Sequence, residues 1–191
     1  MIDLTLYDIF NKNLSTLKKT SRDTSTKPYS YMTESLLQVV DFDKSKNQYA
    51  STQKIRDCPK SVDAVFQQTD GKIVFVEFKN GYIDRTVEYE IKQKIYDSVL
   101  IFCDVVSMDV GTFRQSAEFI LVYNEEDNQS AEENKKSTVQ FSKSYVDIVS
   151  KLGKLANKET VLWKLDFFEN YCFGKLHTYN KAEFKQYTDG L

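Results

Sequence analysis

Two carboxylates and a lysine stand inside two apolar runs of the chain, in the stretch SVDAVFQQTDGKIVFVEFKNG (residues 61–81). Asp63 lies in the first run, Glu77 lies in the second, and Lys79 follows two residues after Glu77. A charged side chain in a buried strand costs free energy unless it is paired or binds a cation. The placement therefore indicates a site where acids and a base act together.

Two carboxylates that converge at one end of a strand pair offer hard oxygen ligands, which Mg²⁺ and Mn²⁺ prefer. Without a cation their negative charges repel each other, so a bound metal would resolve the arrangement. Lys79 would then lie beside a water or a phosphate oxygen, where it could orient the water or stabilise negative charge in the transition state. We therefore expect Asp63 and Glu77 to bind Mg²⁺, with Mn²⁺ as a substitute.

An antiparallel hairpin would position these three residues. Residues 62–67 alternate loosely as a strand, residues 73–79 are rich in β-branched and aromatic side chains, and an Asp-Gly turn signal separates them. Side chains alternate between the two faces of a strand, so Glu77 and Lys79 share one face. The facing residue across a hairpin lies about 5 Å away, so Asp63 can fall near Glu77.

The rest of the chain predicts helices and strands around this hairpin. Apolar residues recur at every fourth position through residues 87–99, which predicts an amphipathic helix over residues 86–102. The other expected elements are a helix at 30–40, a loop at 41–59, a buried strand at 118–123, a helix at 145–155, strands at 161–168 and 171–176, and a last short helix over NKAEFKQYT capped by Thr178 or Asn180.

This order of elements predicts an α/β (α+β) domain, with one mixed central sheet flanked by helices. The chain has 191 residues, of which 41% are apolar, and this is enough for one domain with its own core. We expect residues 1–191 to form a single domain with a core at about 30–123. Residues 140–191 would complete the sheet and the helical layer.

Composition indicates where in the cell the protein is expected. The three cysteines are far apart and form no CxxC pair, which indicates neither a zinc site nor disulfides and fits small buried residues in a reducing cytosol. The first residues carry acids where a signal peptide has lysines, and no stretch approaches the roughly 18 apolar residues of a membrane span. We expect a cytoplasmic protein with no membrane partner.

The Asp63 and Glu77-x-Lys79 set, placed on a hairpin that a helix follows, resembles the PD-(D/E)xK nuclease superfamily. The resemblance covers residues 31–123, and it departs from the family pattern at Val62, where many members have proline. It implies a restriction-endonuclease-like fold and an Mg²⁺-dependent endonuclease that hydrolyses phosphodiester bonds, with DNA favoured over RNA. It also implies that the Phe78 carbonyl joins the two carboxylates as a metal ligand, and it suggests microbial defence as a setting.

Two further site residues are implied by the same resemblance. Many members carry a glutamate on the helix before the first strand, and Glu34 is the candidate, although it could be a solvated helix acid. Many also direct a polar residue at the site from the helix that follows. Gln93 or Lys94 could do so, and helical geometry favours Lys94, which lies on the same side as Ile91 and Ile95. The alternative for Lys94 is a side chain that extends along the edge of the core to water.

Charge is distributed unevenly, although the net charge is only −2. This balance counts against nonspecific coating of nucleic acid but leaves room for a local basic groove. The basic residues 12–27 include Lys18, Lys19 and Arg22, which could contact phosphates or belong to a solvated linker. The acidic residues 124–134 are expected to form an exposed loop or a surface for a basic protein partner.

The sequence is also compatible with a second class of function, that of a binding or regulatory protein. The fold could serve as a non-catalytic nuclease-like binding or regulatory protein, such as an immunity or phage–host interaction module, in which the carboxylates are residual. The acidic pI of about 5.6 and the acidic loop favour this alternative. A homodimer, which would allow both strands of a duplex to be cut, is compatible with the nuclease hypothesis.

Overall fold

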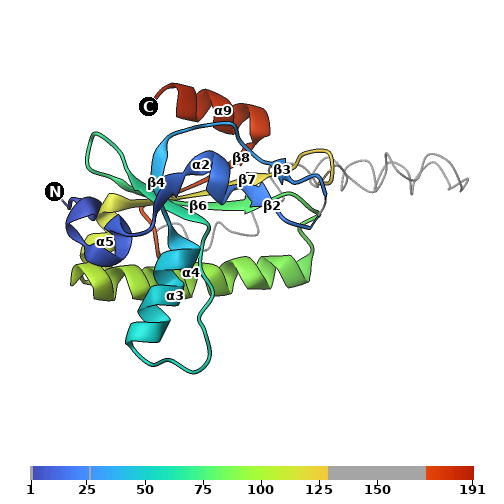
Figure 1. Ribbon diagram of the computed structural model, residues 1–191. Helices are drawn as coiled ribbons and strands as arrows, with labels where there is room; N and C mark the ends of the chain where they lie inside the picture. Colours follow the sequence, from blue (N-terminus) through green and yellow to red (C-terminus); the bar gives the residue numbers. More distant parts are fainter. Residues whose placement is uncertain (1, 26, 129–170) are drawn as a thin grey trace, which may run out of the picture.

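A mixed six-stranded sheet lies at the centre of the part of the chain that the structure describes, and a separate two-stranded ribbon lies beside it. The structure is a computed structural model and describes residues 2–25, 27–128 and 171–191 (Figure 1). Helices cover both faces of the sheet, so the predicted mixed α/β architecture is confirmed.

The sheet combines an antiparallel half and a parallel half. Its strands are β1 (Leu14–Thr16), β4 (Gln38–Asp41), β5 (Ala64–Gln67), β6 (Ile73–Lys79), β7 (Ala117–Tyr123) and β8 (Lys175–Asn180), in that spatial order. Pairing is antiparallel from β1 to β6 and parallel from β6 to β8. The ribbon pairs β2 (Arg22–Asp23) with β3 (Ser30–Tyr31). Strand β6 therefore stands where the two halves meet, with a neighbour on each side.

Helices of very different length surround the sheet. The described elements are η1 (Leu4–Leu6), α1 (Asp8–Asn11), α2 (Leu17–Thr20), α3 (Phe42–Thr52), α4 (Arg85–Val106), α5 (Val110–Ser116) and α9 (Lys181–Asp189). Figure 1 shows α3 and α4 on one face of the sheet and α9 on the other. None of the helices within the described ranges is long and apolar enough to cross a membrane.

The predicted hairpin is confirmed as β5 and β6. In its register Ala64 pairs with Val76, and the turn between the strands places Gly71 at a φ of 91°, where a side chain would be strained. The first strand begins two residues later than expected. Asp63 still belongs to the ladder, because its N–H donates to the Val76 carbonyl over 3.1 Å.

Aromatic packing holds α4 against the hairpin. Phe75 of β6 is fully buried, and its ring centroid lies 5.3–5.8 Å from those of four other phenylalanines, which are Phe42, Phe102, Phe113 and Phe173. The predicted helix at 86–102 is confirmed and extends to Val106, with the Asp84 carboxylate accepting from the Val87 N–H over 2.9 Å. A rigid core therefore fixes α4 relative to the end of β6.

Two predicted elements in the first third of the chain are wrong. Residues 30–40 form no helix: Ser30–Tyr31 pairs in the ribbon, and Gln38–Asp41 is a strand. Val39 and Val40 enter the two opposite cores of the sheet, which suits β-branched side chains in a strand covered on both faces. The expected loop at 41–59 contains α3, whose apolar stripe is too thin to show in the sequence.

The C-terminal strand is displaced from its expected place. Strand β8 covers Lys175–Asn180 instead of residues 171–176, and α9 follows at once. Asn180 caps this helix, as one of the two predicted alternatives: its side chain accepts from the Glu183 N–H, and the Glu183 carboxylate accepts from the Asn180 N–H. The helix expected at 145–155 and the strand expected at 161–168 lie outside the described residues.

The cysteines divide by environment. Cys103 and Cys172 are buried free thiols, as expected for small core residues, and burial raises the pKa of each to about 11. Cys58 is exposed, so the expectation of a buried residue is wrong for this one.

Candidate metal and catalytic site

Four charged side chains from three segments meet at the end of the β5–β6 hairpin. The Lys94 ammonium of α4 lies 2.7 Å from Glu77 Oε1, 2.9 Å from Glu77 Oε2 and 3.5 Å from Asp63 Oδ1. The Lys79 ammonium lies 3.1 Å from Glu77 Oε1. We call these four residues the acid–lysine cluster. Its members are four of the site residues predicted from the sequence, and the structure brings them into one contact network.

Strand register explains why the two acids face each other. Because Ala64 pairs with Val76, the residue before Ala64 stands opposite Glu77. The Phe78 N–H then donates to Asp63 Oδ2 over 2.7 Å and fixes the direction of the Asp63 carboxylate. The N–H and C=O of one extended residue point to the same side of the strand, so the Phe78 carbonyl also faces the side of Asp63.

Helix α4 positions the segment that enters β5. The Ser98 hydroxyl, which is buried, accepts from the Val62 N–H over 2.9 Å, and Asp97 Oδ2 accepts from the Lys60 N–H over 2.8 Å. Lys94 lies one turn before these two residues on the same helix. The helix therefore sets both the main chain next to Asp63 and the ammonium that contacts its carboxylate.

The four side chains of the cluster are exposed to water to different extents. The Glu77 side chain is 0% exposed, and those of Asp63, Lys79 and Lys94 are 16%, 19% and 20% exposed. Two acids and two lysines balance in formal charge. The Lys94 ammonium already lies against both carboxylates and can relieve their repulsion, so the bound metal stays a prediction.

Burial and neighbouring charges shift two pKa values in the cluster. Burial, and then the charge of Glu77, raise the pKa of Asp63 to about 8, although Lys94 and the Phe78 N–H act against the shift. For Lys94, burial acts to lower the pKa, but the charges of Glu77 and Asp63 outweigh it, so the pKa is raised. Lys94 therefore stays protonated at neutral pH. The Asp63 carboxyl, in contrast, gains or loses its proton at a pH close to neutral.

The raised pKa of Asp63 predicts a pH-dependent stability in the absence of metal. Because the folded value of about 8 exceeds the ordinary 3.8, protonated Asp63 stabilises the folded state fully below about pH 4, and this contribution is lost as pH rises through about 8. Between pH 6 and pH 9 we expect the free energy of unfolding to fall by roughly 3 kcal/mol, and by much less in Asp63→Asn. Urea unfolding in EDTA measures both.

The control for this prediction is Asp70→Asn, since Asp70 lies in the exposed hairpin turn and accepts from the Lys72 N–H. This variant should keep the wild-type decline with pH. An equal decline in Asp63→Asn and the wild type would contradict the assignment of the proton to Asp63.

The carboxylate oxygens of Asp63 and Glu77 are the candidate ligands for a small divalent cation. Within the described residues no group of three or more His, Cys, Asp or Glu side chains is arranged to hold a metal. Mg²⁺ needs fewer, because it keeps several waters and uses one or two carboxylates together with substrate phosphate oxygens. The Lys94 ammonium, in contact with oxygens of both Asp63 and Glu77, marks a position that accepts a positive charge. Metal binding there would require the ammonium to move away.

A third carboxylate, missed from the sequence, influences the cluster. Asp43 of α3 is close enough for its charge to raise the pKa of both Asp63 and Lys94. It accepts from the Ser61 hydroxyl over 2.6 Å, two residues before Asp63. Asp43 lies within residues 41–59, for which the sequence predicts a loop. The signal that could have revealed it is Asp41, a helix-capping acid that accepts from the Lys44 N–H.

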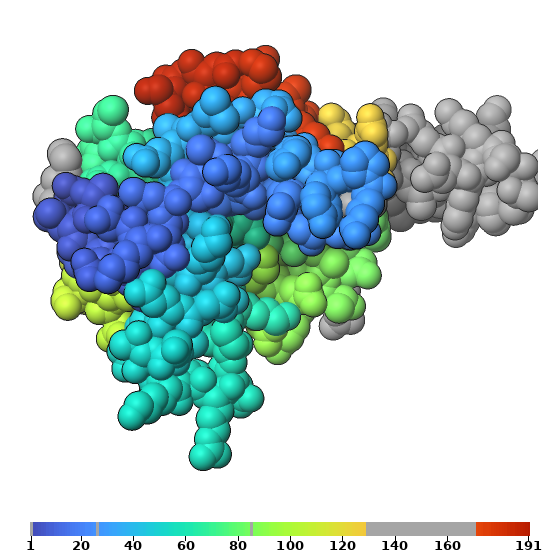
Figure 2. All heavy atoms as spheres, in the orientation of Figure 1, coloured from blue at the N-terminus to red at the C-terminus, as the bar shows by residue number. Residues whose placement is uncertain are grey.

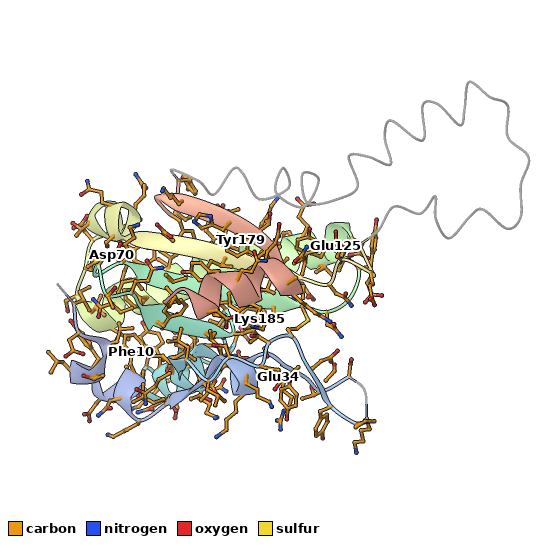
Figure 3. All side chains as sticks on the ribbon, turned by 90° about the horizontal axis from the view of Figure 1, so that it is seen from above. Phe10, Glu34, Asp70, Glu125, Tyr179 and Lys185 are labelled. Atoms are coloured by element: carbon orange, nitrogen blue, oxygen red, sulfur yellow. The ribbon has the colours of Figure 1, made fainter. Side chains whose placement is uncertain are left out.

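Glu34 does not join the cluster, so its predicted role at the site is wrong. It lies in no helix; its side chain is 75% exposed, and its carboxylate lies 2.5 Å from the Lys18 ammonium. Figure 3 shows Glu34 on the N-terminal segment, alongside the helix that carries Lys185. The predicted helix that would have directed Glu34 inward does not form. Lys18 is therefore engaged with Glu34 and does not reach the acid–lysine cluster.

A cleft connects the cluster to the N-terminal segment. It has a volume of about 310 Å³ and is lined by residues that include Arg22, Asp63, Phe78 and Lys79. Figure 2 shows the N-terminal segment, in blue, lying across this side of the molecule between α9 and α4. Of the three basic residues predicted to contact nucleic acid, Arg22 lines the cleft, whereas Lys18 and Lys19 do not.

Comparison with known proteins assigns no family to the chain. No protein-family model, no curated protein and no solved structure matches it. The resemblance to the PD-(D/E)xK superfamily therefore depends on Asp63, Glu77 and Lys79 and on the hairpin and helix that position them.

Proposed function

We propose that the protein is a metal-dependent nuclease that hydrolyses phosphodiester bonds, with DNA favoured over RNA as the substrate. The observation that supports this function is the contact network of Asp63, Glu77, Lys79 and Lys94 beside a cleft. Cytoplasmic location and a role in microbial defence belong to the same proposal.

Each residue of the cluster has a distinct role in the proposed reaction. Mg²⁺, when bound, would act as a Lewis acid toward a phosphoryl oxygen. Asp63, Glu77 and the Phe78 carbonyl would hold it. Lys79 lines the cleft, so its ammonium can orient the attacking water and stabilise the charge that develops on the phosphoryl group.

Lys94 has a different role, since it contacts both proposed metal ligands. Its ammonium would neutralise the two carboxylates in the resting protein and move away from Glu77 when the metal enters. The two carboxylates would thus face a cation both before and after metal binding. This role explains a half-buried lysine between Ile91 and Ile95, which are buried on the same helix.

Replacing Lys79 tests the proposed chemistry. We expect Lys79→Met to slow cleavage by about 10²–10³-fold, the usual cost of removing one charge-stabilising donor from a transition state. The assay incubates plasmid, single-stranded DNA and RNA with Mg²⁺ or Mn²⁺ and follows strand scission with time. The folded state should persist, because Glu77 keeps its contacts with Lys94.

Lys72→Met is the matched control for this variant. Lys72 precedes the same strand, pairs with Glu118 over 3.1 Å and lies at the opposite end of β6. It should cleave at the wild-type rate. Cleavage that is undiminished in Lys79→Met, or no cleavage of any of the three substrates by the wild type, would reject the proposed function.

The alternative function is a non-catalytic binding or regulatory module, and one observation favours it. Both acids of the cluster contact a lysine without a metal, so the four residues can act as a structural ion network alone. Calorimetric titration with Mn²⁺ separates the two functions. Metal binding that is lost in Asp63→Ala supports the nuclease, whereas no metal binding, together with a stable complex with a protein partner, supports the module.

A further inference from the structure

The β2–β3 ribbon stands over the end of the hairpin that carries the cluster. Its two strands pair Arg22 with Tyr31 and Asp23 with Ser30. The ribbon is tied to the end of β6 by Asp23, whose Oδ2 accepts from the Asn80 side chain over 2.8 Å. The same carboxylate accepts from the main chain and the hydroxyl of Ser25. The ribbon therefore has a fixed position beside the proposed catalytic residues.

A cleft lies on each side of this ribbon. The first, of about 310 Å³, is lined by the β2 side of the ribbon and by Asp63 and Lys79. The second, of about 410 Å³, is lined by the β3 side, from Tyr31 to Ser35, and by α9 with Lys181 and Lys185. Met32 lines both clefts, so they adjoin beneath the ribbon.

Two exposed tyrosines stand at the ribbon, each with a cation over its ring: Tyr31 belongs to β3 and lines the second cleft, and Tyr29 comes two residues before it. The Arg22 guanidinium lies 5.0 Å from the centroid of the Tyr29 ring, and the Lys18 ammonium lies 5.1 Å from the centroid of the Tyr31 ring. Both tyrosines are exposed although each has a large aromatic surface. Pairs of an aromatic ring and a cation form the surface on which single-stranded nucleic acids bind, because the ring stacks on a base and the cation meets a phosphate.

We propose that the ribbon binds single-stranded nucleic acid and guides its backbone into the cleft that contains Asp63 and Lys79. The inference rests on the proposed nuclease function and names the substrate class of the same site. Tyr29 and Tyr31 stack on two bases, Arg22 contacts a phosphate, and the strand continues toward Lys79. DNA and RNA strands share the required chemistry of bases joined by phosphates.

Charge favours a single strand over a duplex. Tight binding to a duplex depends on many Lys and Arg contacts with phosphates, and the chain has a net charge of −2. The basic residues near the clefts are accompanied by acids, since Lys18 pairs with Glu34 and Lys185 pairs with Asp189. Stacking needs no excess of positive charge, because every base offers a face to an aromatic ring. A duplex hides those faces.

The experiment measures binding without cleavage. Wild-type protein in EDTA is titrated into fluorescein-labelled 20-nucleotide single-stranded DNA, single-stranded RNA and duplex DNA of the same sequence, and anisotropy gives the dissociation constants. We expect at least one of the single strands to bind more tightly than the duplex. The double variant Tyr29→Ala, Tyr31→Ala should bind that strand about 30-fold more weakly, given the usual contribution of stacking on two rings. Tyr29→Phe, Tyr31→Phe should retain the affinity.

Tyr171→Ala is the matched control, because Tyr171 is an exposed tyrosine next to Arg114 of α5, outside both clefts. It should bind as the wild type does.

The inference is overturned if the duplex binds as tightly as both single strands, if neither single strand binds, or if the double alanine variant binds with unchanged affinity. If the wild type cleaves nucleic acid but the double alanine variant binds it with the same affinity, the binding role of the ribbon is rejected and the nuclease function is not. Tyrosine-dependent binding without cleavage in Mg²⁺ or Mn²⁺ would reject the nuclease but not the ribbon.

Discussion

Glu77→Gln is expected to abolish cleavage while the protein stays folded. The side chain keeps its size and can still accept from one lysine, but the proposed metal site loses one of its two carboxylates. We expect the rate to fall by at least about a thousandfold, which corresponds to about 4 kcal/mol of transition-state stabilisation. Lys79 and Lys94 retain some access to water, so neither ammonium is left buried without compensation. The measurement is strand scission under single-turnover conditions with Mg²⁺, together with urea unfolding.

Glu118→Gln provides a demanding control for this result. Glu118 is also a buried glutamate in a central strand; its carboxylate pairs with Lys72 over 3.1 Å and lies 3.4 Å from His177 Nε2. It pairs in register with Val74, three residues from Glu77 along the hairpin strand. Its loss should affect stability and leave the rate near the wild-type value. If the two variants lose cleavage to the same extent, Glu77 acts through the fold and not through a metal.

Lys94→Met should have the largest effect on the metal-free protein. Methionine fills a similar volume but leaves Asp63 and Glu77 with Lys79 as their remaining ammonium partner. Removing one partner from a buried ion network commonly costs 3–5 kcal/mol, and the contact of Lys79 with Glu77 reduces this, so we expect a loss of about 2–4 kcal/mol. Metal should bind this variant at least about tenfold more tightly, because no ammonium competes for the carboxylate oxygens.

Unfolding in EDTA and in Mn²⁺ distinguishes these two effects. In Lys94→Met the metal should restore most of the lost stability, since binding to the folded state alone stabilises it by mass action. Lys92→Met is the control: Lys92 is on the same helix and pairs with Glu88, one turn away, over 2.6 Å, and such a helix pair contributes little. Weaker Mn²⁺ binding in Lys94→Met than in the wild type would show that the lysine does not compete with the metal.

The central part of the fold could be predicted because its signals are local. The Asp-Gly turn, the alternating strands and the long apolar stripe of the following helix each depend on neighbouring residues, and the structure has the hairpin and α4 where they indicate. The approach of Lys94 to Asp63 and Glu77 also follows from local rules, since a lysine on the inward side of that helix has little else to meet. This is why the contact of Asp63, Glu77, Lys79 and Lys94 could be anticipated, although the choice of a polar residue on that helix came from the family resemblance.

The N-terminal third could not be predicted, because its order comes from contacts distant in sequence. The sequence pattern of Val39 and Val40, beside Leu36 and Leu37, is typical of a helix. They form a strand because β4 pairs with β1 on one side and with β5 on the other. That error misplaced Glu34. The segment that contains Asp43 appears polar in sequence, and its packing on the sheet and on α4 adds the stabilisation that its sequence pattern does not show.

The order of the cluster along the chain has a consequence for folding. Asp63, Glu77, Lys79 and Lys94 all belong to one hairpin and the helix that follows it, whereas β8 comes from residues beyond 170. Contacts between segments close in sequence cost little loop-closure entropy and form fast, while distant strands join late. We therefore expect the carboxylates to meet their ammonium partners while water still reaches them, before β7 and β8 complete the sheet. The acids would enter the interior already paired with ammonium groups, which lowers the barrier that two unpaired acids would impose on the folding of this sheet.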